Sequence, residues 1–236
     1  MTRETAIDAR GVRKVFGKGA LAFEALKGVD FHVGTGEFVM LAGPSGSGKT
    51  TLLSILGCVL SPTAGEVHLC DERVSGLPEA ELPRVRTEYI GFIFQGHNLI
   101  ASLTAEDNVA LQLELRGLDV AAYSERITTL LASVRLTGFE ARYPYELSGG
   151  MQQRAAFCQA MVHEPDTLLL DEPLGKLDAM TRESIRSDLQ SLWMRKRPTV
   201  VFVTHDNRIF HLADRIVHIE DGLIQSPALS TATEHV

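Results

Sequence analysis

One short glycine-rich segment constrains this chain more than any other part of its sequence. Residues 43–50 fit the pattern G-x-x-x-x-G-K-[ST]. They follow a continuous apolar run at residues 37–42, which is typical of a strand buried on both faces. They precede residues 50–58, in which apolar residues recur at helical spacing. A strand, a glycine loop and a helix in this order predict a phosphate-binding loop rather than an ordinary Gly/Ser loop.

The residue types in this loop suit the chemistry of a bound phosphate. Glycine lets consecutive backbone N–H groups turn inward without a Cβ clash, and the positive end of the following helix points at the same anion. The Lys49 ammonium can reach terminal phosphates, and the Thr50 hydroxyl can bind Mg²⁺. The loop therefore predicts a nucleotide site.

A second cluster of candidate residues follows the apolar run at residues 168–170. Asp171 and Glu172 stand where this predicted strand ends, and ligands bind at that edge in doubly wound sheets. Asp171 can hold Mg²⁺ through water together with Thr50, and Glu172 can orient or deprotonate the water that attacks a γ-phosphate. Two solvated acids in a turn are the alternative, which a neighbouring phosphate loop disfavours.

A third motif is the turn Ser148-Gly149-Gly150, which comes directly before a predicted helix at residues 151–162. Free N–H groups, a hydroxyl and a helix dipole would make it a second anion site, which a nucleotide held by another chain would use. A serine-capped helix start is the other interpretation. Local sequence leaves both open.

The order of predicted elements indicates a parallel sheet covered by helices. Further strands are expected at residues 29–33, 89–94 and 199–203, and helices across 104–137 and at 178–193. We expect one domain over residues 1–225, with a core at about 1–95 and 151–225, a helical subdomain inserted at about 96–150, and a flexible tail at 226–236.

Composition excludes several classes of protein. The 236 residues carry a formal charge of -7, which argues against bulk nucleic-acid binding. Cys58, Cys70 and Cys158 lie far apart and form no CxxC pair, so we expect reduced, buried thiols. The sequence has no signal-like start and no apolar run long enough to span a membrane.

Taken together, these motifs resemble the ATPase subunits of ATP-binding cassette (ABC) transporters. The phosphate loop, the Ser148 turn, residues 168–173 and Thr204-His205-Asp206 occur in the order and spacing of that family, over roughly residues 6–222. The resemblance implies an α/β fold, with a P-loop NTPase (RecA-like) parallel-sheet core, an antiparallel β portion and an inserted α-helical subdomain. It implies ATP and Mg²⁺ as ligands.

The resemblance also implies roles for single residues. Glu172, His205 and Gln95 would be catalytic, and Thr50, Gln95 and Asp171 would hold the metal. Phe16 would stack on adenine unless it is a core residue, and Gln95 would reach Mg²⁺ and water unless it is a surface amide. The nucleotide-binding set would be Phe16, Gly43, Pro44, Ser45, Gly46, Ser47, Gly48, Lys49, Thr50, Thr51, Ser148, Gly149, Gly150 and Asp178. Met151 and Lys176 depart from the family pattern, and Met151 should be tolerated because Ser148 and backbone N–H groups make the phosphate contacts.

The family mechanism implies two copies of the chain closing head to tail around two ATP molecules. A separate integral membrane permease would be the partner, with a periplasmic adaptor reached through it, and the chain would lie in the cytoplasm on the inner face of the plasma membrane. Residues 52–58, 91–99 and 103–105 resemble exporters of the lipoprotein-release, macrolide-efflux and heterocyst-glycolipid group. Residues 172–178 instead resemble nitrate- and sulfonate-type importers, so export of a lipid-like or hydrophobic substrate is favoured and import stays open.

Two further classes are disfavoured. Soluble ABC ATPases that act on DNA carry a long coiled coil before the signature turn, and residues 51–147 hold no sustained heptads. A plain P-loop kinase or GTPase lacks the Ser148 turn and the His205 motif.

Overall fold

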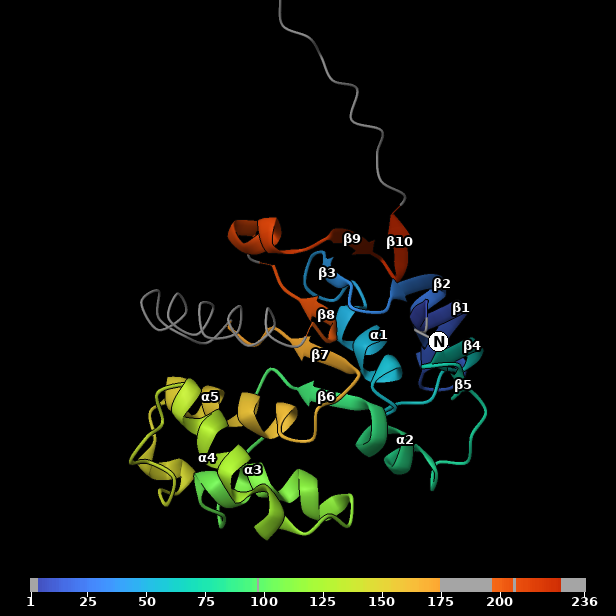
Figure 1. Ribbon diagram of the computed structural model, residues 1–236. Helices are drawn as coiled ribbons and strands as arrows, with labels where there is room; N and C mark the ends of the chain where they lie inside the picture. Colours follow the sequence, from blue (N-terminus) through green and yellow to red (C-terminus); the bar gives the residue numbers. More distant parts are fainter. Residues whose placement is uncertain (1–3, 97, 175–196, 206, 226–236) are drawn as a thin grey trace, which may run out of the picture.

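In the computed structural model, which describes residues 4–96, 98–174, 197–205 and 207–225, two sheets and a group of helices surround a central helix (Figure 1). The strands are β1 (Thr5–Phe16), β2 (Phe23–Gly34), β3 (Phe38–Ala42), β4 (Ala64–Leu69), β5 (Glu72–Arg73), β6 (Ile90–Ile93), β7 (Thr167–Asp171), β8 (Thr199–Val203), β9 (Arg215–Glu220) and β10 (Leu223–Gln225). The α-helices are α1 (Lys49–Leu56), α2 (Leu82–Tyr89), α3 (Ala105–Leu115), α4 (Ser124–Ser133) and α5 (Gly149–Met161). Short 3₁₀ turns lie at Gly19–Leu21, Val120–Tyr123, Pro144–Glu146 and Asn207–Leu212.

The larger sheet has the strand order β10-β9-β3-β8-β7-β6. Neighbouring strands from β9 to β6 run parallel, and only β10 pairs antiparallel. Every residue of β3, β7 and β8 is buried, as a sheet covered on both faces requires. The predicted parallel sheet is therefore confirmed, and the carboxyl ends of β3, β6, β7 and β8 meet at one edge.

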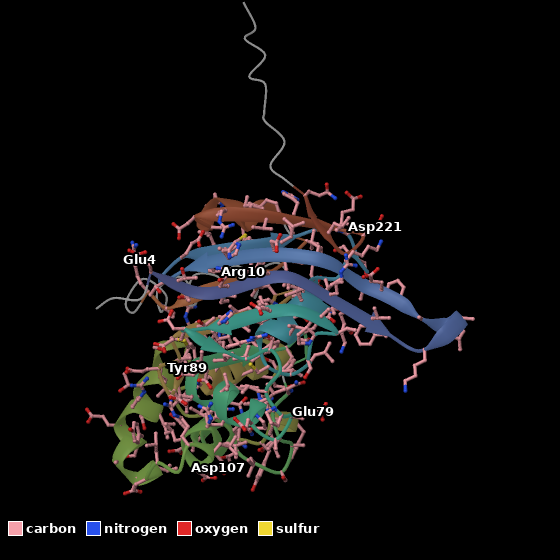
Figure 2. The ribbon with its side chains drawn as sticks, turned by 90° about the vertical axis from the view of Figure 1, so that its right-hand side faces the viewer. Glu4, Arg10, Glu79, Tyr89, Asp107 and Asp221 are labelled. Atoms are coloured by element: carbon pink, nitrogen blue, oxygen red, sulfur yellow. The ribbon has the colours of Figure 1, made fainter. Side chains whose placement is uncertain are left out.

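The smaller sheet is antiparallel and has the order β2-β1-β4-β5. Its inner face contributes Ile7, Phe31 and Leu69 to the core, whereas its outer face carries charged side chains such as Asp8 and Arg10. Figure 2 shows these strands broadside, running across the view, with the helix that carries Asp107 below them. The antiparallel β portion expected from the resemblance is thus present.

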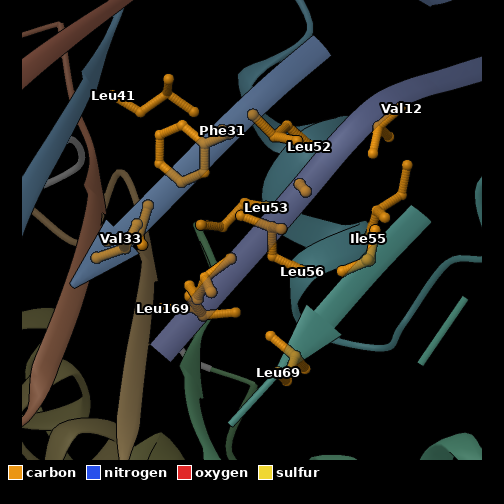
Figure 3. Packing of buried hydrophobic residues seen from close by; sticks show 14 of the residues in the cluster. Val12, Phe31, Val33, Leu41, Leu52, Leu53, Ile55, Leu56, Leu69 and Leu169 are labelled. Carbon is orange, nitrogen blue, oxygen red and sulfur yellow. The ribbon is translucent and has the colours of Figure 1, made fainter. Parts of the chain in front are cut away.

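Helix α1 packs between the two sheets. Leu52, Leu53 and Leu56 are fully buried in one cluster with Phe31 of the antiparallel sheet and Leu169 of the parallel sheet (Figure 3). Burial of each leucine contributes about 2 kcal/mol, so this packing fixes α1 firmly against both sheets. The loop at the start of α1 is held in place by the same contacts.

A second hydrophobic cluster lies among α3, α4 and α5 and extends to the strands β6, β7 and β8. The helices expected across residues 104–137 are confirmed as α3 and α4, and Gly117, with φ +69, follows the end of α3. Thr104 and Asp107 form a capping box that starts α3. The predicted helix at 178–193 and the predicted tail lie outside the described residues, and the domain boundaries stay predictions.

Two details differ from the sequence-based expectation. Residues 82–89 form a helix, α2, and Tyr89 ends this helix instead of starting the next strand. The three cysteines are buried thiols that form no disulfide, as expected. Among the described residues, no helix has the length and apolar character needed to cross a membrane.

Candidate active site

The phosphate loop joins β3 to α1, and its glycines are required by the backbone. Gly43 has φ +153 and Gly48 has φ +105, which side-chain-bearing residues rarely adopt. A Cβ at Gly43 would lie 2.1 Å from the carbonyl oxygen of Ile219, and a Cβ at Gly48 would lie 2.8 Å from that of Ala25. At these two positions the loop lies directly against neighbouring segments and cannot accept a side chain.

Lys49 is the first residue of α1, and its side chain folds back over the loop. Its ammonium donates hydrogen bonds to the carbonyl oxygens of Gly43 at 2.8 Å and Pro44 at 2.7 Å. Burial lowers the pKa of Lys49, although the negative charges of Glu172 and Asp171 oppose that shift. A partly desolvated cation in a ring of backbone groups attracts an anion strongly, because little water screens it.

A hydrogen bond between Thr50 and Asp171 connects the start of α1 to the end of β7. The Thr50 hydroxyl donates to Asp171 Oδ1 at 3.2 Å, and Asp171 is buried at the end of β7. Burial raises the pKa of Asp171, and the Thr50 hydrogen bond opposes this change. These two hard oxygen donors fit Mg²⁺, which takes few protein ligands and completes its shell with water and phosphate oxygens. The described residues contain no cluster of three His, Cys, Asp or Glu that would hold a metal unaided.

Glu172 stands one residue beyond β7 and contacts two of the other predicted catalytic residues. The Gln95 amide donates to Glu172 Oε2 at 3.2 Å, and His205 Nδ1 lies 3.3 Å from Glu172 Oε1. Glu172 has φ +45, and its N–H bonds to the carbonyl oxygen of Val203 at 3.0 Å. This turn aims the carboxylate away from the sheet, toward the groups that follow β6 and β8.

Phe16 lies at the end of β1, and 42% of its surface is exposed, so it is not a core residue. The Lys14 ammonium lies 5.3 Å from the centre of its ring. An exposed aromatic face suits stacking on a base, and this role stays a prediction.

Ser148 caps α5, and its hydroxyl accepts a hydrogen bond from the N–H of Met151 at 3.3 Å. The serine-capped helix start is therefore present, and Ser148 and Gly149 are exposed. Its role toward a second chain's nucleotide stays a prediction, since the same exposed turn serves both interpretations. Asp178 and Lys176 lie outside the described residues.

One buried polar residue escaped the motif-based analysis. Asn108 lies on the apolar stripe of α3, is fully buried and hydrogen-bonds the loop that leads from Gln95. An asparagine inside an apolar helical stripe was its sequence signal, because burying an amide is costly unless it is fully bonded.

Comparison with known proteins identifies the family. The family model described as ABC transporter matches residues 26–175. The chain is similar to a dimeric solved structure of the ATP-binding cassette MJ0796 bound to ADP and Pi, with a TM-score of 0.86, 37% identity and coverage of 93% of this chain and 97% of that one. The MJ0796 sequence from Methanocaldococcus jannaschii is 39% identical over 93% of this chain and 95% of its own.

Relatives with stated transport roles include both directions. The lipoprotein-releasing system ATP-binding protein LolD of Bacteroides thetaiotaomicron is 39% identical, over 93% of this chain and 99% of its own. The sulfate/thiosulfate import ATP-binding protein CysA 2 of Rhizobium meliloti is 41% identical, over 93% of this chain and 58% of its own. The chain spans 32% to 36% of the relatives named as export ATP-binding/permease proteins.

The chain belongs to the ABC transporter family. Within that family it is an ATP-binding cassette, an ATPase with the mixed-sheet and helical architecture of its solved relative.

Proposed function

We propose that this chain is the ATP-hydrolysing subunit of an exporter, and that Glu172 is its catalytic base. The observation that carries the assignment is the pair of contacts on Glu172, one carboxylate oxygen facing Gln95 and the other facing His205. A carboxylate held at both oxygens is fixed in orientation, which general-base catalysis needs.

In this mechanism the residues of the site divide the tasks of binding and hydrolysis. Lys49 and the loop N–H groups bind the phosphates, and Phe16 stacks on the adenine. Glu172 takes the proton from the attacking water, Gln95 and His205 orient that water, and His205 also donates to the γ-phosphate. Thr50, Asp171 and Gln95 would hold Mg²⁺, which supplies charge neutralisation on the phosphates when bound.

We propose that two copies of the chain enclose two ATP molecules, head to tail. Each nucleotide would lie between the Lys49 cradle of one copy and the Ser148 turn of the other, and Asp178 would act across the same interface. The dimeric structure of the cassette MJ0796 supports this arrangement. Ser148 is exposed in the single chain, which leaves its turn accessible to a partner.

We further propose a separate membrane permease as the partner, with export of a lipid-like or hydrophobic molecule. The similarity to LolD along almost the whole of both chains supports a stand-alone export subunit. Import is the second candidate, supported by the similarity to CysA 2 and by residues 172–178 of the sequence.

The base is tested with Glu172→Gln, which keeps the side-chain volume and removes the charge. We expect hydrolysis to fall by at least about a hundredfold, because general-base catalysis contributes that much, while ATP still binds and an ATP-dependent dimer accumulates in gel filtration. Turnover at the wild-type rate would show that Glu172 is not the base.

The partner is tested by purifying the tagged chain from solubilised native membranes. A membrane protein that co-purifies and stimulates hydrolysis supports the transport role, whereas ribosomal RNA or DNA in its place would contradict it. The direction is tested by reconstituting that complex in vesicles and asking whether ATP on the cassette side drives substrate away from that side.

A further inference from the structure

One buried side chain holds residues 100–104, the segment that leads into α3. Asn108, in the second turn of α3, has no exposed surface. Its Oδ1 accepts a hydrogen bond from the N–H of Ile100 at 2.7 Å. Its Nδ2 donates to the carbonyl oxygens of Ile100, Leu103 and Thr104 at distances from 2.9 to 3.1 Å. Both ends of the amide are thus committed to the backbone of this loop.

Asn108 is a polar residue on an otherwise apolar, buried side of α3. Asn108 shares its side of α3 with Ala105, Val109 and Leu113 of an apolar cluster, where leucine or alanine would pack without any polar group to satisfy. Removing the amide would take away the partner of the Ile100 N–H and of the Leu103 carbonyl, whereas the carbonyls of Ile100 and Thr104 keep backbone donors. Asn108 therefore specifies the path of the loop rather than the stability of the helix.

The loop that Asn108 holds carries Gln95 at its other end. Ile100 follows Gln95 by five positions in the sequence, and Leu99 packs against the cluster formed by α3, α4 and α5. Gln95 in turn donates to Glu172 Oε2 at 3.2 Å. A shift of the loop by a fraction of an ångström would therefore change the contact between Gln95 and the carboxylate.

We infer that Asn108 is a positioning residue for ATP hydrolysis, which acts through Gln95. By fixing residues 100–104 it holds the amide of Gln95 against Glu172, so that the helical part of the chain and the hydrolytic site move together. The inference rests on the proposed role of Gln95, and the experiment below separates the two.

The test is a double-mutant cycle of steady-state ATP hydrolysis with Asn108→Ala, Gln95→Ala and the double variant. We expect Asn108→Ala to lower kcat about tenfold to a hundredfold, because a small misplacement of an orienting group costs this much, with KM for ATP unchanged. In the Gln95→Ala background the same substitution should cost less than about twofold. A structural role alone would give the same loss in both backgrounds, and that result would overturn the inference.

Two further variants keep the result interpretable. Ile127→Val removes a buried methyl group from α4 and weakens the same helical cluster without touching the loop, so its kcat should stay at the wild-type value. Asn108→Asp keeps the volume and the acceptor for Ile100, so the cycle is repeated with it if the alanine variant unfolds. Unchanged kcat in a folded Asn108→Asp chain would overturn the inference. Unchanged kcat in Gln95→Ala would overturn the role of Gln95 together with it.

Discussion

At the scale of single residues, Lys49 shows how the fold prepares a side chain for an anion. Its ammonium is buried over the loop and bonded only to neutral oxygens of Gly43, Pro44 and Ser47 among the described residues. Each of these contacts can be exchanged for one to a phosphate oxygen, in which both partners are charged and attract each other more strongly than an ammonium and a neutral carbonyl do. The same burial that lowers the pKa of Lys49 therefore favours binding of the triphosphate.

Lys49→Ala should weaken ATP binding by about tenfold to a hundredfold, the equivalent of one hydrogen bond to a charged group. The change is measured as Kd for a fluorescent ATP analogue, with the unfolding free energy determined in parallel. Wild-type affinity in a folded variant would contradict the assignment of the loop. Lys27→Ala, on an exposed position of β2, serves as the matched lysine control.

His163 makes the stability of the chain depend on pH. Burial, together with the positive charges of Arg116 and Arg126, lowers the pKa of this histidine to about 4, and the hydrogen bond to the Ile90 carbonyl opposes the shift. As the pH falls below about 6.5, the imidazole of His163 is therefore protonated in the unfolded chain but stays neutral in the folded chain. The contribution to stability is complete above pH 6.5 and is lost as the pH falls toward 4, by up to about 3 kcal/mol.

Urea unfolding at pH 7 and pH 4.5 measures this effect against the variant His163→Leu. The variant lacks the titrating group, so its stability should fall less between the two pH values than that of the wild-type chain. Equal losses in the two proteins would show that His163 is not the source of the dependence. Carboxylates that titrate in the same range are common to both proteins and cancel in the comparison.

At the scale of elements, the sequence predicted best those strands that are buried on both faces of the sheet. The strands β3, β7 and β8 are continuous apolar runs, and their complete burial makes such runs necessary. Helix α2 was missed because it is only eight residues long, and its apolar side is limited to Leu82, Val85 and Tyr89 among charged residues. Asn108 was missed because its partners are backbone groups of a loop, and no side-chain motif records such contacts.

The phosphate loop offers a test of how tightly its glycines are constrained. Gly48→Ala should destabilise the chain by about 3 kcal/mol, because its positive φ is strained for alanine and its Cβ meets Ala25 and Leu26. Gly11→Ala has a positive φ with open space around it and should cost only about 1 kcal/mol. The two unfolding free energies check this, and equal costs would mean that the neighbouring segments yield.

At the scale of the whole molecule, the candidate site exists only because strands distant in sequence lie side by side. Loop 43–50, Gln95, the pair Asp171 and Glu172, and His205 follow β3, β6, β7 and β8, whose parallel pairing brings their ends to one edge. The apolar runs of the sequence were enough to predict that loop 43–50 and the pair Asp171 and Glu172 lie at this edge. Gln95 and His205 could be assigned only through the family resemblance, because neither has a local signal of its own.

The proposed head-to-tail dimer predicts complementation between two inactive chains. Lys49→Ala breaks the cradle, and Ser148→Arg blocks the turn that would cap the partner's nucleotide, so each variant alone has two damaged sites. A mixed dimer has one site with both substitutions and one site with neither. We expect the mixture to hydrolyse ATP at up to about a quarter of the wild-type rate, as half of the dimers carry one intact site of two.

Ser148→Arg also removes a helix cap, which costs about 1 kcal/mol, so the loss of a cap needs its own control. Asp119→Ala removes the comparable side-chain cap of the 3₁₀ turn Val120–Tyr123, outside residues 95–104 and the proposed site, and should leave hydrolysis intact. If each nucleotide were instead bound within one chain, mixing would restore nothing, because every chain in the mixture carries a defect. Activity in the mixture above that of either variant therefore requires that the cradle and the turn of one working site come from different copies.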